Sequence, residues 1–129
     1  TRDWSSDVCS SDLHSIKGEL PWLFSGQLPD MNIGTASSSS CASTLRSAVE
    51  QVFARQDQFS WVVDGRFKGG YITRTYGRPE EGVHAVQLEM SWRAYMLEEP
   101  PYSWHEARSS RVRPLLESLV TTLMGWRPE

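Results

Sequence analysis

The sequence predicts an α/β domain in which helices cover a β-sheet. Short apolar segments typical of strands alternate with two longer segments whose apolar residues recur at helical spacing. The length of 129 residues, with 39% hydrophobic and 22% charged residues, suits one globular domain. No internal repeat interrupts this pattern.

The composition excludes several classes of protein. No apolar run approaches the ~20 residues that a membrane span needs, so we expect no membrane partner. A net charge of −3 argues against a nucleic-acid-binding surface, which carries a basic excess. The only cysteines, Cys9 and Cys41, are too few for a disulfide scaffold, so a cytoplasmic location is expected.

The first residues differ from the rest of the chain. Asp3–Leu13 (DWSSDVCSSDL) is rich in serine and aspartate, has no helical or strand period, and resembles a translated sequencing adapter. We therefore treat residues 1–13 as a non-native, disordered tail that makes no specific packing, and residues 14–129 as the C-terminal portion of a single domain. A native disordered tail is the alternative.

The first half of the remaining chain is predicted to hold two strand segments and a helix. Residues 14–28 are expected to be a strand end and an irregular loop, because glycine and proline interrupt them. Met31–Ile33 is a candidate strand, followed by a polar loop at 35–40. A helix is expected from Ala42 or Ser43, because apolar residues recur on one face of it: Leu45, Val49, Val52 and Phe53.

In the second half, Ser60–Val63 and Val83–Met90 are the predicted strands, separated by the glycine pair 69–70 and a loop at 77–82. A final helix is expected to start with a capping box at Ser103–Glu106. Its apolar stripe comprises Val112, Leu115, Leu116, Leu119, Val120, Leu123 and Met124. Pro114 lies inside that stripe and predicts a kink or break at Arg113.

Two polar residues, His14 and Glu89, are candidates for catalytic or metal-binding roles. In a regular strand over Val83–Met90, Glu89 lies on the opposite face from His84, so the two are not expected to serve one metal. A carboxylate in an apolar strand is costly to bury unless it is paired or used. A solvated glutamate on an edge strand is the alternative, and a structural or merely exposed role is the alternative for His14.

The segment Gly65–Arg74 places Arg66, Lys68 and Arg74 around a double glycine. Such a loop can bring backbone close to a ligand while arginine forks bind carboxylates; a glycine hairpin with solvated cations is the alternative. The sequence has no phosphate-binding loop, no dinucleotide fingerprint and no Cys-x-x-Cys motif. Without a G-x-S-x-G elbow, a nucleophilic triad has little support.

Several blocks together resemble one family, the N-formylglutamate amidohydrolases. They are HSIK at His14–Lys17, the spaced Pro, Gly and Asp residues of Pro21–Thr35, GRFKGGYITRTYG at Gly65–Gly77, GVHAVQLEM at Gly82–Met90, and Tyr95-Met96. The resemblance covers nearly everything from His14 onward, and the two long blocks are highly specific.

The resemblance implies hydrolysis of N-formyl-L-glutamate to formate and glutamate, a step of histidine degradation. It implies the C-terminal part of a three-layer α/β/α fold with a mixed sheet, similar to zinc carboxypeptidases and aspartoacylases. By resemblance, His14 is a zinc ligand and Glu89 the general base, so Glu89 is expected to face His14. Arg66, Arg74 and Tyr71 are the expected substrate-binding residues, with Lys68 a weaker candidate.

Some positions depart from the family. Asp12 stands where the family has a native Asp, yet it belongs to the adapter-like segment. Asp64 replaces a commoner Asn, and the loop 36–40 is unusually rich in serine. The remaining zinc ligands are expected upstream, so this chain alone is expected to be inactive. The alternatives are an amidohydrolase of another N-acyl amino acid, or a non-catalytic α/β interaction domain if His14 and Glu89 lie more than about 10 Å apart.

Overall fold

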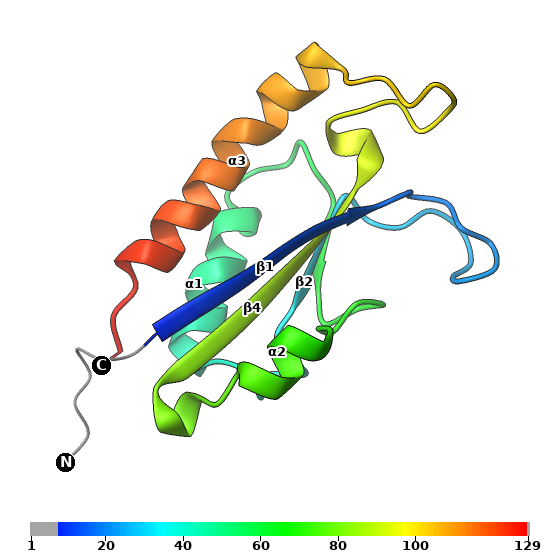
Figure 1. The fold of residues 1–129 in the computed structure, drawn as a ribbon. Helices are drawn as coiled ribbons and strands as arrows, with labels where there is room; N and C mark the ends of the chain where they lie inside the picture. The colour runs from blue at the N-terminus through cyan, green and yellow to red at the C-terminus, as the bar shows by residue number, and fades with distance from the viewer. Residues whose placement is uncertain (1–7, 129) are drawn as a thin grey trace.

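A four-stranded mixed sheet forms the centre of the molecule in the computed structural model, which describes residues 8–128. The strands are β1 (Val8–Ile16), β2 (Met31–Gly34), β3 (Trp61–Val63) and β4 (Val83–Ser91), in the order β1-β4-β2-β3. β4 runs parallel to β1 and antiparallel to β2, and β2 runs parallel to β3 (Figure 1). The predicted α/β class with a mixed sheet is confirmed.

The strand β1 begins earlier than the sequence indicated. Its residues pair with β4 along their whole length, from Val8 opposite Val83 to Ile16 opposite Ser91. The expectation that the segment 1–13 makes no packing is therefore wrong for residues 8–13, while residues 1–7 lie outside the described part of the chain. Strand pairing forms hydrogen bonds between backbone N–H and C=O groups, so a segment without an alternating side-chain pattern can still pair with β4. The foreign origin of this segment stays a prediction.

Helices lie on both faces of the sheet. The helices α1 (Ser43–Ala54) and α3 (Glu106–Gly125) cover one face, and the short α2 (Tyr71–Tyr76) lies against β4 on the other (Figure 1). Two single 3-10 turns, η2 (Pro79–Glu81) and η3 (Trp92–Ala94), flank β4. None of the described helices combines the length and apolarity that crossing a membrane requires.

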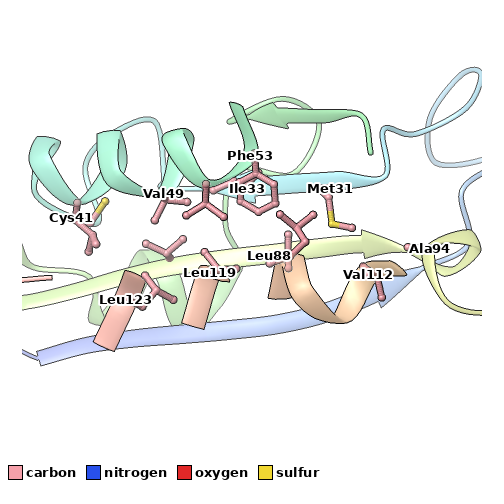
Figure 2. Close-up of a cluster of buried hydrophobic side chains, with 14 residues drawn as sticks. Met31, Ile33, Cys41, Val49, Phe53, Leu88, Ala94, Val112, Leu119 and Leu123 are labelled. Carbon is pink, nitrogen blue, oxygen red and sulfur yellow. The ribbon is translucent and has the colours of Figure 1, made fainter. Parts of the chain in front are cut away.

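The hydrophobic core fills the space between the sheet and the helices α1 and α3 (Figure 2). The predicted face of α1 is confirmed, since Leu45, Val49, Val52 and Phe53 are all buried. The predicted stripe of α3 is confirmed in part: Val112, Leu115, Leu119 and Leu123 are buried, whereas Val120 and Met124 are exposed. The core face of β4 carries Val86 and Leu88.

Two local predictions and one alternative differ from the structure, while a kink at Arg113 stays a prediction. The helix α3 is not broken at Arg113; it continues through Pro114, whose missing N–H costs only a bond to the carbonyl of the exposed Ser110, where water can replace it. The N-cap is His105, whose Nδ1 accepts the backbone N–H of Arg108 at 3.2 Å, in place of a box based on Ser103. The glycine pair 69–70 starts α2 and no hairpin.

Candidate active site

Polar side chains from three neighbouring strands lie side by side on the face of the sheet opposite the core. Asn32 of β2 stands opposite Glu89 of β4, which stands opposite His14 of β1. Residues directly opposite each other on paired strands point to the same face, so these three form a row across the sheet, the polar row. In the next row, Gln87 stands opposite Asp12.

The predicted relation of the two strand residues is confirmed. Glu89 and His14 are cross-strand neighbours, about 5 Å apart at their Cα atoms by ordinary strand spacing. His84 points to the core side, where its Nδ1 accepts the N–H of Ala42 at 3.0 Å and its ring packs against Trp126. The separation of more than 10 Å that would favour a non-catalytic domain does not occur.

Glu89 is a buried carboxylate, with 8% of its surface exposed, so the alternative of a solvated edge glutamate is wrong. Burial raises its pKa above the ordinary value, because desolvation penalises the charged form. His14 and a hydrogen bond from Gln87 oppose this rise, and the neighbouring Asp12 adds to it. The site therefore holds a proton-binding group whose pKa is shifted toward neutrality.

His14 is oriented by a neighbour on its own strand. Its Nδ1 lies 2.8 Å from Oδ1 of Asp12, and its side chain is 60% exposed. A carboxylate on Nδ1 leaves Nε2 facing outward, the arrangement that metal-binding histidines commonly have. Within residues 8–128, however, no group of three or more His, Cys, Asp or Glu side chains could hold a metal ion.

Asn32 and Gln87 were not singled out from the sequence. Asn32 is 1% exposed, and its Nδ2 donates to the carbonyls of Pro29 (2.9 Å) and Glu89 (3.0 Å). Its Oδ1 is buried without a partner in the described part of the chain. A buried amide inside the apolar strand Met31–Ile33 was the available signal, because polar groups are rarely buried there without a task.

A cavity of about 380 Å³ lies beside α2. It is lined by Ala36, Ser37, Ser39, Lys68, Gly69 and Arg74, and we call it the cationic pocket. Its two walls are joined by the N–H of Ala36, which donates to the carbonyl of Lys68 at 2.6 Å. Gly34 permits this approach, since a Cβ there would lie 2.6 Å from the Lys68 carbonyl carbon.

Asp64 anchors the serine-rich wall of the cationic pocket. Its carboxylate accepts the N–H of Thr35 at 2.8 Å and the hydroxyl of Thr35 at 2.5 Å. Its backbone has a φ of 53°, a conformation that Asp and Asn tolerate better than most residues. Asp64 is therefore compatible with the turn at this position.

The predicted substrate-binding residues are not all brought together. Arg74 and Lys68 line the cationic pocket, whereas Arg66 donates from Nη2 to the carbonyl of Leu23 at 2.9 Å and is absent from its lining. Tyr71 is 69% exposed and packs edge-on against Tyr76. Arg74 is therefore the stronger candidate for binding an anionic group.

Comparisons with known proteins point to one family. A family model described as N-formylglutamate amidohydrolase matches residues 2–96, which include the whole adapter-like segment Asp3–Leu13. The N-formylglutamate deformylases of Pseudomonas aeruginosa and Pseudomonas putida are 43% and 42% identical over 118 residues. Each match covers 92% of this chain and 44% of the relative, so the chain spans less than half of those proteins.

A solved structure agrees in fold. The crystal structure of an N-formylglutamate amidohydrolase from Ralstonia eutropha JMP134 matches 87% of this chain and 41% of its own, with a TM-score of 0.73 and 23% sequence identity. At that identity the likeness concerns the fold.

Proposed function

The chain belongs to the N-formylglutamate amidohydrolase family, and from this premise we propose that it is the C-terminal portion of an enzyme that hydrolyses N-formyl-L-glutamate to formate and L-glutamate. In this proposal the intact enzyme has a three-layer α/β/α fold similar to that of zinc carboxypeptidases. The observation that carries the proposal is the buried Glu89 next to His14 on the face opposite the core.

Glu89 suits the role of general base. In the proposed reaction it accepts a proton from the water whose oxygen attacks the formyl carbon. When the C–N bond breaks, Glu89 returns that proton to the leaving nitrogen, so formate and the free amine of glutamate result. A base works best when its pKa lies near the working pH, and the burial of Glu89 shifts its pKa in that direction.

Zinc remains part of the proposal for the intact enzyme. The residues described here offer His14 as one ligand, which is fewer than the three that catalytic zinc sites use, so they do not form a zinc site by themselves. When bound, zinc polarises a carbonyl and acidifies water.

Substrate recognition is assigned to the cationic pocket. N-formylglutamate carries two carboxylates, and Arg74 with Lys68 offers two cations beside the hydroxyls of Ser37 and Ser39. Arg66 and Tyr71 lie outside this lining and stay as secondary candidates, with Arg66 available only if it exchanges its bond to Leu23.

The experiment is formate release by the intact enzyme with Glu89→Gln, Arg74→Met and, as a matched surface control, Glu117→Gln. Loss of a general base should slow turnover by about 10²–10⁴-fold, whereas the exposed control should not change it. Arg74→Met should cost about 2–4 kcal/mol in kcat/KM, and less for N-formyl substrates that lack the matching carboxylate.

The same assay separates the alternatives. Faster hydrolysis of another N-acyl amino acid than of N-formylglutamate would favour a relative with different specificity. No hydrolysis of any of them by the intact, zinc-loaded protein would favour a non-catalytic domain. Equal losses in Arg74→Met for all substrates would make Arg74 structural.

A further inference from the structure

Two adjoining cavities lie between the first half of α3 and the loop 55–60 that follows α1. One has a volume of about 200 Å³ and the other of about 270 Å³, and both are lined by Gln58, Phe59 and Arg111. Because they share these residues, we treat them as one groove, the arginine groove. In the described part of the chain it shares no lining residue with the cationic pocket, so the two are separate places on the molecule.

Three arginines of the arginine groove have no carboxylate partner among residues 8–128. They are Arg55 at the end of α1, and Arg108 and Arg111 of α3. Four other arginines each lie within 3.9 Å of a carboxylate oxygen: Arg46, Arg78, Arg93 and Arg113. The groove therefore gathers positive charge that the described residues leave uncompensated.

Asp30 is the acidic residue that lines the groove, and its carboxylate is already occupied. Its Oδ1 lies 2.8 Å from Nε of Arg93, and its Oδ2 accepts the N–H of Ser60 at 2.9 Å. Arg93 thus offsets the charge of Asp30. The charges of Arg108 and Arg111 remain for a ligand.

Neutral acceptors hold two of the three guanidinium groups in place without neutralising them. Nη1 of Arg108 donates to the carbonyl of Met96 at 2.9 Å, and Nη2 of Arg55 donates to Oε1 of Gln51 at 3.3 Å. A side chain that is already anchored loses less conformational entropy when it binds a ligand. Arg111 lines both cavities, so it can contact both halves of a ligand that spans them.

The chemistry of the lining favours phosphate groups attached to an apolar body. Arginine forks bind phosphate oxygens with paired hydrogen bonds, and two cavities that meet at Arg111 suit two linked phosphates. A single carboxylate, with two oxygens, would leave part of this donor set unused. The half-buried Phe59 lines both cavities, and Pro114 and Leu115 continue the apolar wall in the larger one.

We propose that the arginine groove binds an organic diphosphate, with its phosphates on Arg55, Arg108 and Arg111 and its apolar or aromatic body on Phe59. The groove lies on the side of the sheet that α1 and α3 cover, whereas the polar row lies on the opposite face. This site is therefore additional to the proposed active site, and it does not depend on the proposed function.

The test is a titration of the isotope-labelled 129-residue chain with adenosine diphosphate at low salt. Magnetic resonance signals of the arginine Nε–H groups and of the Phe59 ring locate the bound ligand. Pyrophosphate presents the phosphates alone, adenosine the body alone, and glutarate a dicarboxylate. Arg111→Gln removes the shared cation, while Arg113→Gln removes the same charge from the same helix outside the groove and is the matched control.

Adenosine diphosphate should shift the signals of all three unpaired arginines and of the Phe59 ring in the parent chain. Pyrophosphate should shift the same arginines and leave the Phe59 ring unchanged, and adenosine should bind at least tenfold more weakly than the diphosphate. Arg111→Gln should weaken diphosphate binding about tenfold, because hydrogen bonds to a charged group are lost. Arg113→Gln should change it less than about twofold.

Three outcomes would overturn the proposal. The first is equal affinity for the diphosphate in Arg111→Gln and the parent chain, with the methyl resonances of the buried Leu119 showing that the fold is kept. The second is a set of shifts confined to Arg74 and Lys68, which would place the anion in the cationic pocket. The third is glutarate binding in the groove as tightly as the diphosphate. None of these outcomes bears on formate release, which tests the proposed function separately.

Discussion

Replacing Glu89 by glutamine should make the chain more stable at pH 8 and leave its stability at pH 4 nearly unchanged. Glu89 is 8% exposed, and burial is the largest cause of its raised pKa. Glutamine has almost the same shape without the charge, so the substitution removes the desolvation cost and leaves the packing in place.

The pH dependence follows from the direction of the pKa shift. The folded chain holds the Glu89 proton to a higher pH than the unfolded chain, whose carboxyl has the ordinary value of 4.5. Between these two pKa values the folded state binds more protons, so the free energy of unfolding falls as the pH rises. Below 4.5 both states are protonated and the cost disappears; above the folded pKa the cost is complete.

The gain at pH 8 should be about 1–2 kcal/mol. A buried, poorly compensated polar or charged group costs roughly 1–3 kcal/mol, and the hydrogen bond from Gln87 and the nearby His14 offset part of it here. At pH 4 the two chains should agree within about 0.5 kcal/mol.

Urea denaturation of both chains from pH 4 to pH 8 measures this difference, with Glu117→Gln on the exposed side of α3 as the control. The control should show no gain that grows with pH. A Glu89→Gln chain that is less stable than the parent at pH 8 would refute the reasoning, since the charged carboxylate would then be a net stabilising group.

Three further outcomes are expected. Phe53→Ala should lower the free energy of unfolding by about 3–5 kcal/mol in the same assay, because Phe53 is 0% exposed and stacks on Trp61 with ring centroids 6.1 Å apart. Deletion of residues 1–13 removes most of β1 and should cost on the order of 2 kcal/mol by calorimetry; an unchanged melting temperature would mean that residues 8–13 contribute nothing to the fold. The 129-residue chain with added zinc should release no formate from N-formylglutamate, and zinc-dependent turnover would show that its residues complete a metal site.

Features with a strict period were predictable from the sequence. The buried face of α1 follows from the spacing of Leu45, Val49 and Phe53, and the opposite faces of His84 and Glu89 follow from strand alternation. Both depend only on residues within one element. Val120 and Met124 of the predicted α3 stripe are exposed, because α3 packs mainly against α1 among the described helices, so its buried stripe is narrower than its apolar stripe.

Features that depend on partners were not predictable in this way. The cap of α3 is the Nδ1 of His105 and not the hydroxyl of Ser103. The helix α2 begins after Gly70, whose N–H donates to Gln87 and whose carbonyl accepts from Arg74. The early part of β1 has no strand pattern at all. It is extended because β4 offers it a row of backbone partners.

The polar row depends on register, which no local pattern contains. β1 and β4 are parallel strands far apart in the sequence, and their pairing sets His14 opposite Glu89. A shift of β1 by one residue would set Leu13 or Ser15 opposite Glu89 and turn His14 toward the core, because successive side chains alternate between faces. Alternation could therefore place Glu89 on a face, but only the resemblance to a family could join it to His14. Gln87, two residues from Glu89 on the same face, needed only the alternation to be found.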